Sequence, residues 1–123
     1  MKIKVFEEIE AWQNARELTK EIYKISDENR FSKDWPLRDQ IRRAGISIMS
    51  NIAEGFDSGF KGEFLRFLNI AKRSASEVQS QLYVALDQEY IKKAEFDLIY
   101  SRSTSIRKQI SGFIRYLKDF NLK

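Results

Sequence analysis

Acidic residues are the first candidates for chemistry, because helical bundles commonly hold di-metal sites between paired carboxylates. Glu54 and Glu77 are the acids that helical spacing places near the middle of such a bundle. A di-metal site of this kind also requires Glu-x-x-His motifs, and the sequence contains no His and no Cys. Catalytic triads built on His and thiolate catalysis are excluded by the same absence. We therefore predict no catalytic residue, no metal and no cofactor.

The glycine-rich stretch over residues 55–62 is a second candidate, because such loops can bind phosphate. It contains Gly55, Gly59 and Gly62. This spacing matches neither the P-loop nor the dinucleotide fingerprint, and no predicted strand precedes it. The stretch is better explained as a flexible connection between two helices.

Basic residues give the clearest indication of a binding function. The 123 residues include 22 Lys and Arg against 18 Asp and Glu, and five bases but no acid lie between Arg102 and Lys118. Cations near a helix C-terminus can simply offset the helix dipole. They can also follow a phosphate backbone, and the sequence leaves both explanations open. The residues predicted to contact nucleic acid are Arg107, Lys108, Arg115 and Lys118, followed by Arg66, Lys72 and Arg73.

A line of polar residues runs beside the apolar stripe of the second predicted helix. Glu77 flanks the core of the helix that should pack next to it. We predict a structural polar network in which Arg43 pairs with Glu54 or Glu77, and Asn51 satisfies nearby polar groups. The polar line consists of Arg43, Ser47, Ser50 and Glu54.

A second set of apolar residues lies away from the predicted core. A solvated helix face does not normally carry a second apolar stripe, so the stripe favours self-association. The alternative is that these apolar residues occur there by chance. The predicted interface residues are Ile46, Met49, Ala53, Ile70 and Val84.

Helices must position all these candidates, since the chain has one Pro and five Gly and its apolar residues recur every three or four positions. No alternating run bounded by a tight turn predicts a strand. We expect an all-α, up-down-up-down antiparallel four-helix bundle, formed as a single domain over residues 1–123. Helices are predicted over residues 6–26, 35–54, 62–88 and 92–118.

Local signals at both ends of the second helix support its predicted limits. Pro36 suits the first turn of a helix, and Asp34 or Ser32 can cap it. Gly55 is predicted to end the helix in the left-handed conformation.

The sequence carries no targeting signal that we recognise. Residues 1–8 turn acidic at once and lack the apolar stretch of a signal peptide. No window approaches about 18 uncharged apolar residues. We therefore expect a cytoplasmic protein without a membrane partner.

A more specific pattern lies in residues 38–55. Gln40-Ile41-Arg42-Arg43-Ala44, then Ser47-Ile48 and Ser50-Asn51-Ile52-Ala53-Glu54-Gly55, resembles the signature of bacterial proteins encoded in intervening sequences of 23S rRNA genes. Further similarity, in Ala11-Trp12-Gln13-Asn14-Ala15 and Arg66-Phe67-Leu68 among others, extends to about residue 91. The chain departs from the family pattern at Gly45, where Ala is usual, and at Arg73, where Gly is usual.

The resemblance implies a homopentameric ring of four-helix bundles without known enzymatic activity, a fold similar to the accessory variability protein of diversity-generating retroelements. Nucleic-acid binding is suspected for the family. We therefore expect a non-enzymatic oligomer that binds structured nucleic acid, with RNA favoured over DNA, through a basic surface. The alternative is a protein–protein interaction scaffold with no direct nucleic-acid role.

Overall fold

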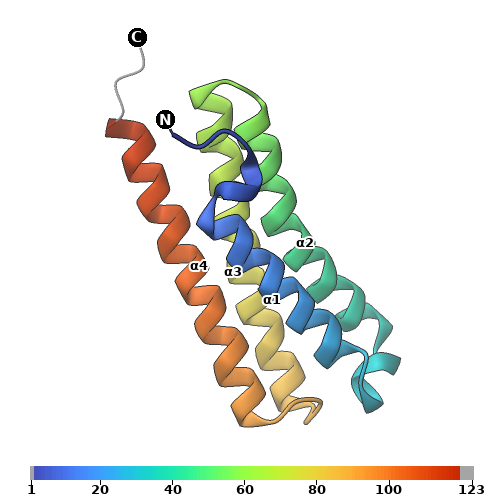
Figure 1. The fold of residues 1–123 in the computed structure, drawn as a ribbon. Coiled ribbons are helices and arrows are strands. Elements are labelled where there is room, and N and C mark those ends of the chain that lie inside the picture. The colour runs from blue at the N-terminus through green and yellow to red at the C-terminus, as the bar shows by residue number, and fades with distance from the viewer. Residues whose placement is uncertain (1, 120–123) are drawn as a thin grey trace.

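Four long helices form the computed structural model, which describes residues 2–119 (Figure 1). Short 3-10 helices, η1 (Phe6–Glu8) and η2 (Asn29–Lys33), precede the first and second of them. No strand occurs in residues 2–119, so the predicted all-α class is confirmed. The long helices are α1 (Glu10–Ser26), α2 (Trp35–Asp57), α3 (Lys61–Asp87) and α4 (Lys93–Asp119).

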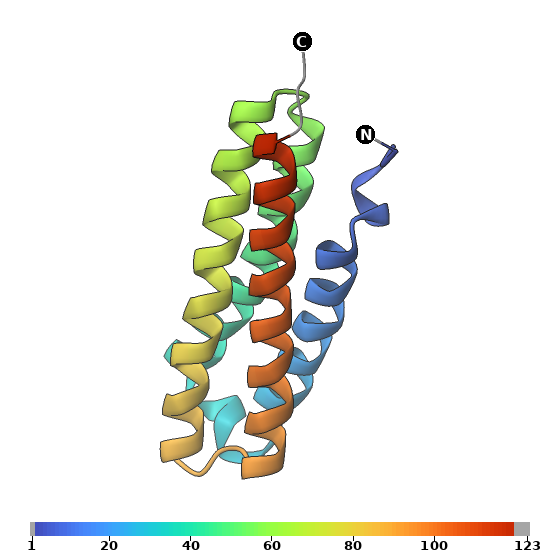
Figure 2. The ribbon, with the colours of Figure 1, turned by 90° about the vertical axis from the view of Figure 1, so that its left-hand side faces the viewer.

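Each helix packs against the next one along the chain, and α1 also packs against α4. Successive helices run in opposite directions, as Figure 1 shows. Figure 2 looks onto α4, with α3 on one side of it and α1 on the other. This is the predicted up-down-up-down bundle, because short connections make sequential helices antiparallel neighbours.

Aliphatic side chains fill the interior of the bundle. Every helix contributes members with no exposed surface, including Ile22, Ile48, Leu68 and Ile106. Burying one such side chain contributes about 1.5–3 kcal/mol to stability, so the core stabilises the bundle far more than any single surface ion pair. Within residues 2–119, no helix combines the length and the apolar composition that a membrane span requires.

The first helix begins later than its apolar spacing predicts. Residues 6–8 form a 3-10 turn, Ile9 is extended (φ −74°, ψ 120°), and the α-helix starts only at Glu10. Ile9 is 1% exposed, so the break in the helix accompanies the burial of this side chain. The side chain of Gln13 donates to the carbonyl of Glu7 over 2.8 Å and ties the turn to α1.

The prediction that Gly55 ends the second helix is wrong, since α2 continues to Asp57. Gly55 is buried inside the helix, where an added Cβ would lie 2.7 Å from the Cβ of Phe67 on α3. A glycine is needed here because the two helices approach too closely for a larger residue. In the connection between α2 and α3, Gly59 lies in the left-handed region, with φ at 77°.

The predicted start of α2 is confirmed. Asp34 is the N-cap residue, and its Oδ1 accepts a hydrogen bond from the backbone N–H of Leu37 over 3.2 Å. Pro36 lies in the first turn, where a missing N–H leaves no hydrogen bond unmade.

Candidate nucleic-acid interface

Two adjoining clefts between α3 and α4 gather basic side chains from both helices. One has a volume of about 500 Å³ and the other about 450 Å³, and Lys72 and Arg107 line both of them. No Asp or Glu lines either cleft. We call the two clefts together the basic groove. Its lining residues are Asn69, Lys72, Arg73, Ser76, Thr104, Arg107, Lys108, Ser111 and Arg115.

The same spacing of residue types on the two helices builds this groove. Asn69-x-x-Lys72-Arg73-x-x-Ser76 on α3 matches Thr104-x-x-Arg107-Lys108-x-x-Ser111 on α4. Residues three, four and seven positions apart share one face of a helix, so each set points to one side. The four uncharged polar residues were not predicted as site residues, and this doubled pattern is the signal that identifies them.

Arg107 is held in the groove by a buried amide. Its Nη1 donates to Oε1 of Gln79 over 3.3 Å, and Gln79 is 6% exposed. Nε2 of Gln79 donates to Oγ1 of Thr104 over 2.8 Å and to the carbonyl of Tyr100 over 3.3 Å. Arg107 forms no ion pair within residues 2–119, so its positive charge is not neutralised by a neighbouring acid.

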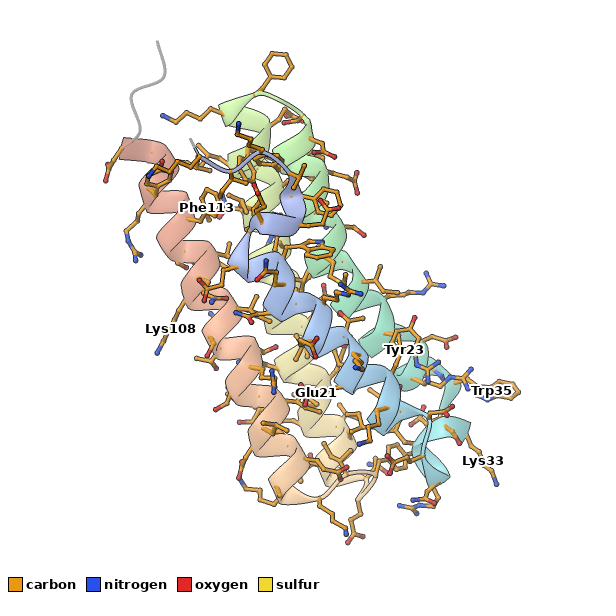
Figure 3. The ribbon with its side chains drawn as sticks, viewed as in Figure 1. Glu21, Tyr23, Lys33, Trp35, Lys108 and Phe113 are labelled. Atoms are coloured by element: carbon orange, nitrogen blue, oxygen red, sulfur yellow. The ribbon has the colours of Figure 1, made fainter. Side chains whose placement is uncertain are left out.

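Five of the seven basic residues predicted to contact nucleic acid line the basic groove. Lys118 does not line it, and it lies exposed in the last turn of α4. Figure 3 shows Lys108 pointing away from α4 into the surroundings. The five residues in the groove are Lys72, Arg73, Arg107, Lys108 and Arg115.

Arg66 lies outside the groove and already has a partner. Its Nη2 lies 3.0 Å from Oε2 of Glu63, and its guanidinium lies 4.5 Å from the ring centroid of Phe67. The hydrogen bond from Arg66 lowers the pKa of Glu63, and the same bond raises the pKa of Arg66. The charge of Arg66 is therefore balanced locally, unlike that of Arg107.

Part of the predicted polar network lies between α2 and α3. Nδ2 of Asn51 donates to the carbonyl of Ser47 over 2.7 Å and to its Oγ over 3.0 Å. Oγ of Ser47 lies 2.9 Å from Oγ of Ser74 on α3. This chain of hydrogen bonds joins the two helices near their middle.

The described residues do not form the predicted ion pair between Arg43 and Glu54 or Glu77. Arg43, Glu54 and Glu77 are all exposed, and no ion pair links Arg43 to either acid within residues 2–119. Arg43 and Glu54 lie about 16 Å apart along α2, which is beyond the reach of a direct pair on one helix. An exposed pair between Arg43 and Glu77 would gain little in water.

The apolar residues predicted to form an oligomer interface differ in exposure. Ile46 and Val84 are 42% and 45% exposed. Ala53 and Ile70 are half-buried, and Met49 packs partly against the core of its own chain. Ile46 and Val84 therefore offer the most apolar surface to a second chain.

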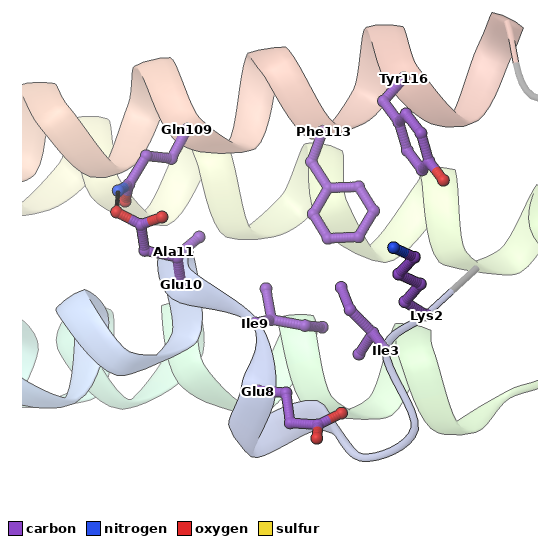
Figure 4. Close-up of a pocket in the computed structure, with 9 residues that line it drawn as sticks. All are labelled: Lys2, Ile3, Glu8, Ile9, Glu10, Ala11, Gln109, Phe113 and Tyr116. Carbon is purple, nitrogen blue, oxygen red and sulfur yellow. Dashed lines mark hydrogen bonds between the residues drawn. The ribbon is translucent and has the colours of Figure 1, made fainter.

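Another pocket lies between the N-terminal segment and the C-terminal half of α4 (Figure 4). Its volume is about 610 Å³, and Ile3, Ile9 and Phe113 contribute apolar surface to it. At one end Nε2 of Gln109 donates to Oε1 of Glu10 over 3.1 Å. It contains no set of convergent basic or metal-ligating groups, and no cluster of three or more potential metal ligands occurs within residues 2–119.

Comparison with known proteins finds a matching family and solved structures with a similar fold. The model of the 23S rRNA-intervening sequence protein family matches residues 7–112. The fold is similar to the crystal structure of a protein with unknown function from the S23 ribosomal protein family of Bacteroides thetaiotaomicron, with a TM-score of 0.78 and 29% identity over 85% of this chain and 95% of that one. A search of curated proteins found no match. Because the family match covers α1, α2, α3 and most of α4, the chain belongs to the 23S rRNA-intervening sequence protein family.

Proposed function

We propose that this protein is a non-enzymatic nucleic-acid-binding protein that holds the phosphates of a structured RNA in its basic groove. The observation that carries the proposal is the composition of the groove, in which two helices contribute five cations and no acid. Lys and Arg bind phosphate chiefly by replacing condensed counterions, and this contact does not depend on sequence.

The groove also supplies hydrogen-bond donors of the kinds that nucleic-acid-binding proteins direct at phosphate oxygens. Arg107 offers a planar guanidinium, which can donate two bonds to one phosphate. Hydroxyls of Thr104 and Ser111 line the same cleft as Arg107. Membership of a family named for an intervening sequence of 23S rRNA supports RNA over DNA as the ligand.

Self-association is part of the proposal, and the family resemblance suggests five subunits in a closed ring. The exposed side chains of Ile46 and Val84 provide apolar surface for such contacts. Five cations on one chain would bind RNA weakly. Several copies on one rigid body raise the effective concentration for each further contact, so modest grooves can act together.

The second candidate function is a protein–protein interaction scaffold. The large exposed rings of Trp35 and Phe60, 66% and 72% exposed, favour this alternative because aromatic residues are common in protein interfaces. Salt dependence separates the two functions. RNA affinity that depends on phosphate contacts falls steeply with salt, whereas an apolar protein contact does not.

Fluorescence anisotropy with a labelled RNA hairpin, from about 50 to about 300 mM salt, tests the proposal. We expect the logarithm of the affinity to fall linearly with the logarithm of the salt concentration. Neutralising Arg107 and Lys108 to Gln should weaken binding and flatten this slope. The matched control neutralises Lys20 and Lys24, two exposed cations of α1, and should change little. Absence of RNA retention at low salt would favour the scaffold.

A further inference from the structure

An aromatic cluster continues the face of α3 and α4 that carries the basic groove. The ring centroid of Tyr83 lies 4.9 Å from that of Phe96 and 5.8 Å from that of Tyr100, edge-on in both cases. Phe96 and Tyr100 stack on each other at 5.3 Å. Phe96 is 6% exposed and Tyr100 is half-buried, whereas Tyr83 is 50% exposed. Tyr83 is therefore a ring that is supported from within and open to solvent.

Gln79 connects this cluster to the groove. Its amide accepts from Arg107 and donates to the carbonyl of Tyr100, and Tyr83 follows it by one turn of α3. Arg107 and Tyr100 are about 10 Å apart along α4, a distance that a few nucleotides span. Past the cluster, Lys93 lies over the ring of Phe96 and pairs with Asp97, so its charge is balanced there. Unneutralised cations thus lie on the groove side of the rings.

We infer that the groove and Tyr83 together bind an unpaired stretch of RNA, with phosphates in the basic groove and one base stacked on Tyr83. A base can stack on a protein ring only where it is not paired and stacked inside a duplex. Single-stranded nucleic acid is commonly bound by a positive groove combined with exposed aromatic rings. Phe96 and Tyr100 hold the Tyr83 ring in place. A base that stacks on this ring therefore immobilises little further side chain, which lowers the entropic cost of binding.

The inference rests on the proposed function, since the groove must hold the phosphates for the ring to be reached. It narrows the ligand from structured RNA in general to an unpaired segment, such as a hairpin loop. A protein partner would also bury Tyr83, but an acid-free row of cations beside an exposed ring is better matched to a polyanion with flat bases.

Binding of two labelled RNAs to the full-length protein tests the inference. One RNA is a single-stranded oligouridine, and the other is a blunt duplex with the same number of phosphates. We expect the single strand to bind more tightly. Tyr83→Ala should weaken that binding about tenfold without changing its salt dependence, because stacking releases no counterions. Tyr83→Phe keeps the ring and should bind as the unaltered protein does.

Phe60→Ala is the matched control, because it also removes a large exposed ring, here at the start of α3 and away from the groove. It should leave RNA affinity unchanged. Equal binding of duplex and single strand, or equal effects of Tyr83→Ala and Phe60→Ala, would overturn the inference while leaving the proposed function intact. Loss of oligomerisation in Tyr83→Ala, seen by sedimentation, would also overturn it by assigning Tyr83 to a subunit contact. If neither RNA binds at low salt, the proposed function itself fails.

Photocrosslinking gives a readout that does not depend on how well the variants fold. Ultraviolet irradiation of the unaltered protein with 5-iodouridine-substituted single-stranded RNA should attach the RNA to Tyr83, as mapped by mass spectrometry. Attachment at Phe60 or Trp35 in place of Tyr83 would contradict the inference.

Discussion

Oε1 of Gln79 accepts a hydrogen bond from Nη1 of Arg107 over 3.3 Å, so a buried neutral amide orients the central cation of the basic groove. The other end of the amide is bound to Thr104 and to the carbonyl of Tyr100. Gln79 therefore fixes the position of Arg107 while leaving its charge available to a ligand.

Replacing Gln79 by Glu should keep Arg107 in position while lowering the net positive charge of the groove. The carboxylate can still accept from Arg107, but it neutralises one cation of the groove and loses the bond to the carbonyl of Tyr100, which can only accept. We expect weaker RNA binding and a salt slope smaller by about one phosphate contact, measured by anisotropy titrations. Gln40→Glu adds the same charge at an exposed position of α2 and serves as the control. Equal effects of the two changes would show that the position of the charge is unimportant.

Replacing Gly55 by Ala should destabilise the protein. A Cβ there would lie 2.7 Å from the Cβ of Phe67 and 3.0 Å from Cδ1 of Phe64, so α2 and α3 must move apart. Overpacking of this kind typically costs about 1–3 kcal/mol, against a gain of up to about 1 kcal/mol from better helix propensity. Urea denaturation measures the difference. Gly62→Ala, where the added Cβ meets no atom within 4 Å, should be neutral or slightly stabilising.

Alkaline pH should destabilise the protein by breaking the hydrogen bond that joins the α3–α4 connection to the start of α2. The hydroxyl of Tyr90 donates to Oδ2 of Asp34 over 3.0 Å, and this bond raises the pKa of Tyr90. Because the pKa of Tyr90 is higher in the folded protein, the bond stabilises the fold fully below the pKa of an unfolded tyrosine, about 10. The stabilisation is lost as the pH rises through the pKa of Tyr90 in the folded protein. We expect Tyr90→Phe to flatten the fall of unfolding free energy above about pH 10.

Tyr23→Phe provides the comparison, because no hydrogen bond of the Tyr23 hydroxyl is found in the part of the chain that the structure describes. The fall of unfolding free energy should be flatter for Tyr90→Phe than for Tyr23→Phe. Parallel profiles for all three proteins would show that the bond to Asp34 does not contribute.

Ile46→Glu should weaken self-association. Ile46 is 42% exposed, so a charge there leaves the core intact but would be buried without a partner in a subunit interface. Sedimentation velocity at micromolar concentration should then show smaller species than the unaltered chain forms. Leu98→Glu, at a 50% exposed position of α4, is the control. A monomeric unaltered chain would rule out assembly under these conditions.

The sequence by itself determined the class of fold and most of the helix limits. Apolar residues such as Ala15, Leu18, Ile22 and Ile25 recur with the period of a helix, and this period is a local property of the chain. Asp34 and Pro36 mark the start of α2 through capping chemistry that is equally local. The absence of His and Cys likewise excluded whole classes of chemistry without any structure.

Only the tertiary structure decided which helix faces meet. Lys72 and Arg107 are 35 positions apart and form one groove because α3 and α4 pack side by side. The structure alone identified Gly55 as a site of close helix approach, and it alone showed that Arg43 stays exposed within the chain. Spacing along one helix specifies the direction of a side chain relative to its own axis. Its contacts depend on the rotation and depth at which neighbouring helices pack, which the core as a whole determines.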